Sequence, residues 1–309
     1  MKVLVVGNGN HSNKRIIPAL LSINNLSSIY ISYRGVNKFF HKIEKLNYIP
    51  ENMVPENKYD LIIYATQPIF HFENLIKYKN FSEKHLIEKP ITSNVNEIFS
   101  RKFEKVYKEK QIYESLMYLH HPVYETVRNI LETENCIGFN AKFTVPHSNF
   151  SHYRYDKEKG GGSLLDQGIY PISLITSLFK EIIIKNQTIK YDKKLKIDLK
   201  GKIEFENIKN CSGTAYWELG NSYSNFLKIE TEIAKYEFPN IFSKNENIDY
   251  KFLKTVNKSK EVINIGKHNQ FQIMYEDILN NNFRAFEYSN YDNLKKRYRI
   301  IKNLLDINI

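Results

Sequence analysis

Residues 1–21 read MKVLVVGNGNHSNKRIIPALL, and this stretch decides the fold. The apolar run KVLVV has the length of a buried strand, and Gly7 follows it directly. Apolar residues then recur at helical spacing from Ser12 to Ile23. A strand, a glycine turn and a helix in this order form the first unit of a doubly wound sheet. The apolar run is too short for a signal peptide and no A-x-A-like site follows it, so we interpret Met1–Gly7 as a strand.

The glycine turn carries a partial dinucleotide-binding motif. Gly7 is placed to make the tight turn, and Gly9 lets backbone N–H groups approach a pyrophosphate at the helix N-terminus. Ser12 stands at the third position, so the motif is incomplete and a plain strand-to-helix turn remains the alternative. We expect the turn to bind the cofactor through five residues: Gly7, Asn8, Gly9, Asn10 and His11.

The end of the second expected strand indicates which dinucleotide is bound. NAD-binding folds commonly place an acid here for the ribose hydroxyls, whereas an arginine accommodates the 2′-phosphate of NADP. This chain offers Ser32, Tyr33 and Arg34 and no acid. Since a guanidinium binds phosphate bidentately, the sequence favours NADP(H), with NAD(H) as the alternative.

Strands and helices alternate up to about residue 118. We expect strands at Lys2–Val6, Ser28–Tyr33, Asp60–Ala65, Lys84–Glu88 and Gln111–Met117, and helices at Ser12–Ile23, Val36–Leu46, Phe70–Tyr78 and Asn94–Lys108. Apolar strands separated by helices are typical of a parallel sheet covered on both faces. The sequence therefore predicts a dinucleotide-binding Rossmann domain at residues 1–118.

The remaining residues, 119–309, predict an α+β domain that binds substrate and mediates oligomerisation. Its expected strands are Ile137–Val145, Ile182–Tyr191, Leu195–Glu206, Cys211–Leu219 and Ser224–Phe238, and its expected helices are Pro122–Glu132, a stretch ending near Phe179, His268–Leu279 and Tyr291–Leu305. Short polar links between successive strands indicate a large, mostly antiparallel sheet. Whether the C-terminal helix returns to the first domain is left open.

Composition excludes several classes of protein. The net charge is +11, but the lysines are scattered without a basic block, which argues against nucleic acid and is compatible with a phosphorylated small substrate. No apolar run approaches the roughly 18 residues of a spanning helix, so no membrane partner is expected. Cys136 and Cys211 lack metal or disulfide spacing, so we expect two ordinary buried thiols, no metal site and a cytoplasmic location.

Four later segments carry a resemblance to a known family. They read ATQPIFH (residues 65–71), EKHLIEKPIT (83–92), ESLMYLHHP (114–122) and GGGSLLDQGIYPI (160–172). With the glycine turn, their order and spacing resemble the Gfo/Idh/MocA oxidoreductases over nearly the whole chain, especially the branch of glucose–fructose oxidoreductase and the dihydrodiol dehydrogenases. The resemblance implies an NAD(P)-dependent oxidoreductase that acts on a sugar or nucleotide sugar, with glycan synthesis as its expected pathway, and that assembles as a homodimer or homotetramer.

Two of these segments follow strands of the expected parallel sheet. Thr66, Gln67 and Pro68 come after the strand at 60–65, where open α/β sheets bind ligands, and the resemblance places this loop and His71 against the nicotinamide half. In Glu88-Lys89-Pro90 the proline ends the strand, so that Lys89 projects into the cleft. There the resemblance implies that Glu88 and Lys89 contact the cofactor and that Lys89 stabilises charge on the substrate oxygen.

The glycine-rich segment supplies the rest of the expected catalytic trio of Lys89, Asp166 and Tyr170. Asp166 and Tyr170 are four residues apart on one helix, so both can act on one substrate atom. We expect Tyr170 to exchange a proton with the substrate, Lys89 to lower the phenol pKa and Asp166 to orient the substrate. Many family members have histidine in place of Tyr170. The alternative is that Asp166 pairs locally and Tyr170 packs in the core.

Other residues are weaker candidates for binding substrate. His121 in ESLMYLHHP and Tyr153 and Arg154 in the loop before the glycines are expected to contact substrate. Leu119 stands where the related branch often has arginine, which puts the substrate of that branch in question. Three alternatives stay open on the same fold: an imine reductase, an NAD-dependent glycosidase and a non-catalytic dinucleotide-binding sensor.

Overall fold

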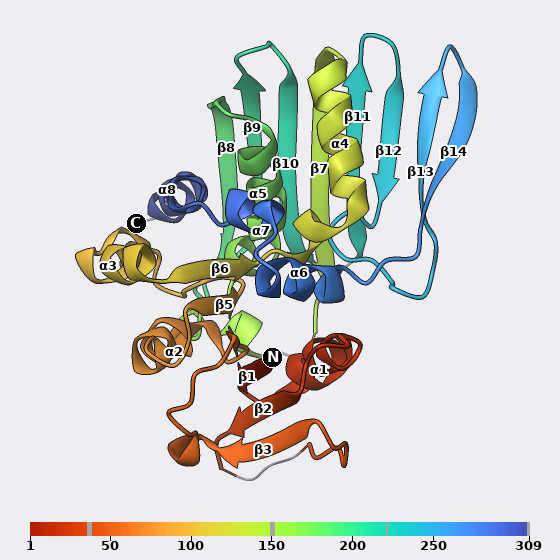
Figure 1. Ribbon diagram of the computed structural model, residues 1–309. Coiled ribbons are helices and arrows are strands. Elements are labelled where there is room, and N and C mark those ends of the chain that lie inside the picture. Colours follow the sequence, from red (N-terminus) through yellow and green to blue (C-terminus); the bar gives the residue numbers. More distant parts are fainter. Residues whose placement is uncertain (36–38, 149–151, 221, 308–309) are drawn as a thin grey trace. The chain divides into compact units, whose positions relative to one another are not determined.

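The computed structural model describes residues 1–35, 39–148, 152–220 and 222–307 (Figure 1). The chain forms two compact units. The first comprises Met1–Met117 and Phe271–Tyr291, and the second comprises Tyr118–Gln270 and the chain from Asp292 onward. The segment Phe271–Tyr291 therefore groups with the N-terminal part of the chain.

The first unit is built on a parallel sheet of six strands in the order β3-β2-β1-β4-β5-β6. Its strands are β1 (Lys2–Val6), β2 (Ser28–Tyr33), β3 (Leu46–Pro50), β4 (Leu61–Tyr64), β5 (Lys84–Glu88) and β6 (Gln111–Ser115). β1 lies between β2 and β4, and Val3, Leu4 and Val5 are fully buried. An apolar strand buried on both faces is what a doubly wound sheet requires at its centre, so the predicted Rossmann fold is confirmed.

Helices from both ends of the sequence belong to this unit. They are η1 (Ser12–Ile16), α1 (Ile17–Leu21), η2 (Glu51–Met53), η3 (Pro68–Phe70), α2 (His71–Tyr78), η4 (Val95–Phe99), α3 (Arg101–Glu109), α6 (Gln270–Leu279) and α7 (Phe283–Tyr288). Lys84 Nζ donates to the carbonyls of Ile278 and Leu279, 2.8 Å each, at the C-terminus of α6. A cation at the negative end of a helix stabilises it, and this contact fixes α6 to the sheet.

One expected helix is wrong. Residues 36–38 of the segment Val36–Leu46 lie outside the described residues, and the rest of it holds no helix. Instead Leu46 begins the edge strand β3, which pairs in parallel with β2. Pairing with an available sheet edge outweighs the helical spacing of apolar residues in this segment.

The second unit contains an eight-stranded sheet in the order β14-β13-β12-β11-β7-β10-β9-β8. Its strands are β7 (Cys136–Pro146), β8 (Ile182–Asp192), β9 (Ile197–Asn207), β10 (Ser212–Gly220), β11 (Ser224–Thr231), β12 (Lys235–Pro239), β13 (Tyr250–Val256) and β14 (Ser259–Gly266). β7 and β10 pair in parallel and every other pair is antiparallel, which confirms the mostly antiparallel sheet.

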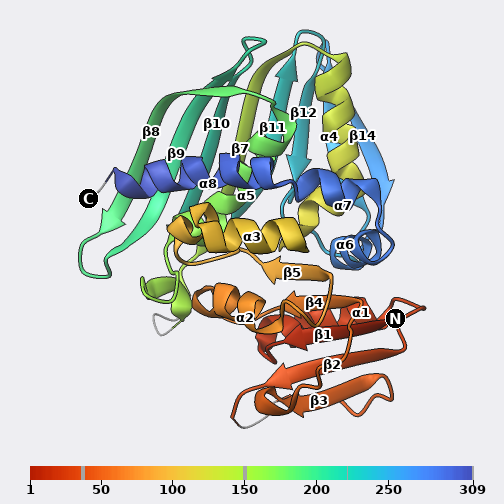
Figure 2. The same ribbon diagram turned by 60° about the vertical axis from the view of Figure 1, so that its left-hand side comes forward.

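Helices cover one face of this sheet (Figures 1 and 2). They are α4 (Pro122–Thr133), η7 (Leu164–Gly168), α5 (Ile169–Leu178) and α8 (Tyr291–Asp306), while η5 (Met117–His120) and η6 (Tyr153–Tyr155) are short turns. Lys296 Nζ of α8 donates to the carbonyl of Phe179, 2.6 Å away, at the end of α5. The last helix thus packs within the second unit.

Both glycine-rich segments enter their helices through a π-helical turn. η1 precedes α1, whose second residue is Pro18, and η7 precedes α5, whose third residue is Pro171. A proline has no N–H to donate within a helix, so a change of hydrogen-bond pattern just before it relieves the mismatch. Pro171 is therefore accommodated without ending the helix.

The second sheet is larger than the sequence predicts. The expected strand Ser224–Phe238 is a hairpin of β11 and β12, because Thr231 turns the chain by accepting a hydrogen bond from the N–H of Ala234 (3.0 Å). β13 and β14 were not predicted. Their turn uses Asn257 and Lys258 with positive φ angles of 46° and 72°, a pair that carries no glycine signal.

The two cysteines are free and buried, as expected. They lie next to each other, since Cys136 begins β7 and Cys211 directly precedes β10, and a hydrogen bond from Cys211 lowers the pKa of Cys136. Among the described residues, no group of three or more His, Cys, Asp or Glu side chains is arranged to hold a metal ion. Within the same residues, no helix is both long enough and apolar enough to cross a membrane.

Candidate active site

The turn after β1 requires glycine at its first position. Gly7 has a φ of +114°, and a Cβ there would lie 2.8 Å from the carbonyl oxygen of Ala65. The N–H of Gly7 donates to the carbonyl of Ser32 (3.1 Å), and Ser12 Oγ donates to the carbonyl of Gly7 (2.7 Å). Ser12, at the incomplete third position of the motif, thus holds the turn closed.

The same turn leaves room for an anion. A Cβ on Gly9 would meet no heavy atom within 4 Å, and Asn10 and His11 are exposed. The first N–H groups of the following helix have no partner within the helix and carry the positive end of its dipole. Asn8 stays fixed beside them, because its Oδ1 accepts from Asn13 Nδ2 at 2.7 Å. Open space, backbone donors and a helix N-terminus fit the pyrophosphate of a dinucleotide.

His11 connects the glycine turn to the end of β5. Its Nε2 lies 3.3 Å from Glu88 Oε1, which also accepts from Ser115 Oγ at 2.8 Å. Desolvation by neighbouring groups lowers the pKa of the partly exposed His11, but the charge and hydrogen bond of Glu88 outweigh it, so that the net shift is upward. Burial raises the pKa of Glu88, and the contacts with His11, Ser115 and Lys89 reverse this, so that Glu88 stays ionised. His11 therefore links the glycine turn to the ionised Glu88 at the end of β5.

His71 joins the two loops that end β4 and β5. Its Nδ1 lies 2.9 Å from the carbonyl oxygen of Pro90 and its Nε2 lies 3.0 Å from that of Thr66. The ring is fully buried, and burial lowers its pKa. His71 thus connects Thr66 to the segment after Lys89 through both of its ring nitrogens. In the same loop Gln67 is exposed and Pro68 is buried. The Lys89-Pro90 peptide bond is cis.

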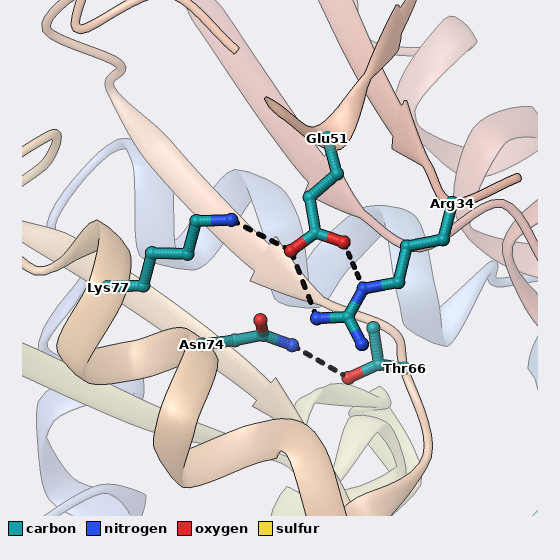
Figure 3. A network of polar contacts seen from close by, with 5 residues as sticks. All are labelled: Arg34, Glu51, Thr66, Asn74 and Lys77. Atoms are coloured by element: carbon teal, nitrogen blue, oxygen red, sulfur yellow. Dashed lines mark hydrogen bonds and ion pairs between the residues drawn. The ribbon is translucent and has the colours of Figure 1, made fainter. Parts of the chain in front are cut away.

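Arg34 lines a pocket of about 520 Å³ together with Tyr33, Gly35, Pro50, Glu51, Asn52 and Lys77. Its guanidinium forms a two-pronged ion pair with Glu51, and Lys77 Nζ reaches the same carboxylate at 2.8 Å (Figure 3). The hydrogen bond from Arg34 is the main reason that the pKa of Glu51 falls to about 2. Neither Glu51 nor Lys77 was predicted, because η2 and α2 bring them to Arg34 from other parts of the sequence.

In the second unit, Arg154 and Asp166 form an ion pair. Asp166 is only 3% exposed, and its Oδ2 also accepts from Gln167 Nε2 at 2.6 Å. Burial lowers the pKa of Arg154, and the neighbouring carboxylate reverses the effect and raises it. The structure thus brings together one predicted substrate residue and one predicted catalytic residue. Tyr153 precedes them in η6, where its ring packs against His152 at 4.7 Å.

The three glycines make this approach of Arg154 to Asp166 possible. A Cβ on Gly161 would lie 2.6 Å from the carbonyl oxygens of both Tyr153 and Arg154. Gly162 has a φ of +114°, and its N–H donates to the carbonyl of Arg154 at 2.9 Å. The loop therefore wraps tightly around the turn that presents Arg154, and side chains at these positions would push it away.

Asp198 on β9 holds the start of the helix that carries Asp166. Its Oδ2 accepts from Ser163 Oγ at 2.5 Å and from the N–H of Leu164 at 2.6 Å. Burial raises the pKa of Asp198 to about 6 despite these hydrogen bonds. The sequence gives no signal for this role, since Asp198 lies within the expected strand Leu195–Glu206.

Tyr170 follows Asp166 on the same helix and is 7% exposed. Its ring lies 5.0 Å from Phe143, 5.8 Å from Phe242 and 5.9 Å from Tyr118, measured between ring centroids. The hydroxyl of Tyr118 bonds Ser173 Oγ at 2.7 Å one turn further on. Aromatic packing thus fixes the orientation of the phenol.

His121 is buried and caps α4, because its Nδ1 accepts from the N–H of Val123 at 3.1 Å. Burial is the main cause that lowers its pKa to about 2, with further contributions from Lys244 and His268. The ring is therefore neutral, and its Nδ1 stabilises the N-terminus of α4 as a hydrogen-bond acceptor. The sequence signal for this role is the proline that follows it, which is favoured in the first turn of a helix.

The chain is similar in sequence to known proteins over part of its length. No family model matches the chain. The chain is 33% identical over 117 residues to the dTDP-3,4-didehydro-2,6-dideoxy-alpha-D-glucose 3-reductase of Actinomadura kijaniata, which covers 36% of this chain and 34% of that protein. It is 25% identical over 181 residues to the reductase of the same name from Saccharopolyspora spinosa, 55% of this chain and 54% of that protein. The chain thus matches between one third and about half of the length of these relatives.

Similarity of the fold extends further. The crystal structure of KijD10, a 3-ketoreductase from Actinomadura kijaniata in complex with NADP and TDP-benzene, superposes with a TM-score of 0.87 at 17% identity and covers 99% of this chain and 97% of that one. These comparisons confirm the resemblance to the Gfo/Idh/MocA oxidoreductases, and the chain has the two-part fold of that family.

Proposed function

We propose that the protein is an NADP(H)-dependent oxidoreductase that transfers a hydride between the nicotinamide and a carbinol or carbonyl carbon of a nucleotide-linked sugar. The observation that carries the proposal is the glycine turn at the carboxyl edge of the parallel sheet. Gly7 packs against the end of β4, and His11 next to it contacts Glu88 at the end of β5. Ligands of open α/β sheets bind at this edge.

The substrate class is supported by the relatives. The curated reductases act on a dTDP-linked keto sugar, and KijD10 was crystallised with NADP and a TDP derivative. The positive net charge is compatible with a pyrophosphate-bearing substrate. On this basis we assign a nucleotide sugar to the proposed reaction and NADP(H) as the favoured cofactor.

The proposed roles of the residues follow from their chemistry. A bound nicotinamide supplies or accepts the hydride. The turn at Gly7 and Gly9 binds the pyrophosphate, and the loop at Thr66 supports the nicotinamide end. Lys89 stabilises the negative charge on the substrate oxygen, and Tyr170 exchanges the proton with it. Asp166, held by Arg154, orients the substrate hydroxyls.

The two units are proposed to divide this work. Residues 1–118 form the cofactor domain, completed by α6 and α7, and residues from 119 onward otherwise form the substrate domain. Half-exposed side chains such as Thr214 and Tyr216 alternate with buried ones along β10, which leaves one face of the large sheet accessible. We propose that this face mediates a homodimer or homotetramer and that the protein acts in the cytoplasm. Measurement of the molar mass in solution tests the oligomeric state.

The experiment is a screen of dTDP-linked keto sugars with NADPH, in which oxidation of the nicotinamide is followed by absorbance. We expect Lys89→Ala and Tyr170→Phe each to lower kcat by about 100-fold or more, because the loss of one proton-transfer or charge-stabilising group typically has an effect of this size. NADPH should still bind to both variants. The exposed residues Lys58 and Tyr223 provide matched controls as Lys58→Ala and Tyr223→Phe.

Other outcomes would replace the proposal. Release of a monosaccharide without net change of the nicotinamide indicates a glycosidase, and turnover of imines alone indicates an imine reductase. Full activity of both Lys89→Ala and Tyr170→Phe refutes the assigned roles. Cofactor binding without any turnover indicates a sensor.

A further inference from the structure

Two cations and one carboxylate share the pocket at the end of β2. The Arg34 side chain is 52% exposed and the Lys77 side chain is 46% exposed, whereas Glu51 is 13% exposed. Figure 3 shows Arg34 and Lys77 reaching Glu51 from opposite sides. The carboxylate is thus enclosed between two cations that themselves remain open to solvent.

The charges of this group do not balance. Arg34 and Lys77 carry two positive charges and Glu51 carries one negative charge, because its low pKa keeps it ionised. A phosphate monoester carries about −1.5 to −2 charges near neutral pH and has three acceptor oxygens. It would therefore match the two cations better than a single carboxylate does. Glu73 adds a weaker negative field at Arg34.

The position of the pocket identifies what would bring such a phosphate. Gly7 is hydrogen-bonded to Ser32 on β2, and Tyr33, Arg34 and Gly35 line the pocket immediately after it. A dinucleotide seated on the glycine turn places its adenine ribose at the end of the second strand. The group that reaches Arg34 and Lys77 is then the 2′ substituent of that ribose.

We propose that Glu51 is a built-in competitor of the 2′-phosphate and that Lys77 is a second ligand of this phosphate beside Arg34. The phosphate of NADP(H) displaces the Glu51 carboxylate from both cations. The free 2′-hydroxyl of NAD(H) instead donates to Glu51 where it stands. Glu51 therefore sets the ratio of the two affinities and lets one pocket accept both cofactors. This inference rests on the proposed dinucleotide binding.

Displacement of Glu51 is compatible with its place in the fold. The residue begins η2, a helix of three residues that follows the edge strand β3. No residue of η2 is buried, so a change of side-chain conformation there disturbs no core packing. Arg34 keeps a second contact, since its guanidinium lies 5.0 Å from the centre of the Phe70 ring.

Calorimetric titration with adenosine 2′,5′-bisphosphate and with AMP tests the proposal, because the two probes differ only in the 2′-phosphate. In Glu51→Gln we expect the bisphosphate to bind about fivefold or more tightly and AMP to bind equally or more weakly, since one competing charge is removed. In Lys77→Ala we expect the bisphosphate to bind about fivefold more weakly and AMP to change little. Glu56→Gln is the matched control, since Glu56 is exposed and does not line the pocket.

The outcomes separate this inference from the proposed function. If the unmodified protein binds both probes and Glu51→Gln and Lys77→Ala leave their affinity ratio unchanged, Glu51 and Lys77 do not discriminate and the inference is overturned. If the unmodified protein binds neither probe, nor NADPH, the proposed function fails with it. Opposite changes of the ratio in Glu51→Gln and Lys77→Ala support the inference, and these are measured without any turnover.

Discussion

Replacement of Asp198 by asparagine is expected to change how the stability of the protein depends on pH. Asp198 is buried, and Ser163 and Leu164 donate to one of its oxygens, so an isosteric amide can keep both hydrogen bonds. What the substitution removes is the ionisation. Burial raises the pKa of this carboxyl from 3.8 to about 6 in the folded protein.

The magnitude follows from the two pKa values. The native state holds the proton to higher pH than the unfolded chain does, so this residue stabilises the fold most below about pH 4, and its contribution is lost as the pH rises to about 6. A difference of about two pH units is worth about 3 kcal/mol. Asparagine does not titrate, so the free energy of unfolding of the protein should fall by about 3 kcal/mol relative to Asp198→Asn across this interval.

Urea unfolding of both proteins between about pH 4 and pH 7 measures this difference, since all other titrating groups are shared and cancel. A matched control is Asp192→Asn, on the neighbouring strand β8, whose side chain lies in a half-exposed turn. Parallel stability curves for the protein and Asp198→Asn would refute the reasoning. They would mean that Asp198 is ionised in both states and that the start of the helix is held by a charge.

Three further changes test the loops of the site by urea unfolding and by titration with NADPH. Gly7→Ala should cost about 2 to 4 kcal/mol, because its φ is positive and the added Cβ meets the Ala65 carbonyl, and an unchanged stability would contradict the observed turn. Gly9→Ala, where the Cβ meets nothing within 4 Å, should alter stability by less than about 1 kcal/mol yet weaken NADPH binding; equal binding would show that the ligand does not approach Gly9. Arg154→Leu should lower the free energy of unfolding by about 2 to 4 kcal/mol, because it removes the cation that pairs with the buried Asp166. The double variant Arg154→Leu with Asp166→Leu should recover part of this loss. Equal losses of stability in the single and double variants would refute the pairing.

The strand, turn and helix at residues 1–21 could be predicted because each step is local. An apolar run, a glycine that needs a positive φ and a helical repeat follow one another without reference to the rest of the chain. The same holds for the glycines at 160–162. Contacts between distant segments could not be predicted in this way. Glu51 meets Arg34 only because β3 joins the sheet edge, and the sequence indicates a helix in the segment that precedes this strand.

Buried polar partners were missed for a related reason. Asp198 reads as one residue of a strand, and His71 lies in the first turn of an expected helix, where only the resemblance gives it a role. Their roles depend on which backbone groups lie opposite them in the fold: the start of η7 for Asp198, and the carbonyls of Thr66 and Pro90 for His71. The pairing of Cys136 with Cys211 likewise depends on the parallel contact of β7 with β10.

The most direct test of the proposed reaction is transfer of deuterium. The protein is incubated with NADPH deuterated at C4 of the nicotinamide and with a dTDP-linked keto sugar, and the sugar product is analysed by mass spectrometry. We predict that the deuterium appears on the new carbinol carbon, and that the Tyr170→Phe protein incorporates it at least about 100-fold more slowly. A product that gains hydrogen only from water, or a dTDP sugar that is hydrolysed without any labelled carbinol, would contradict hydride transfer by this protein.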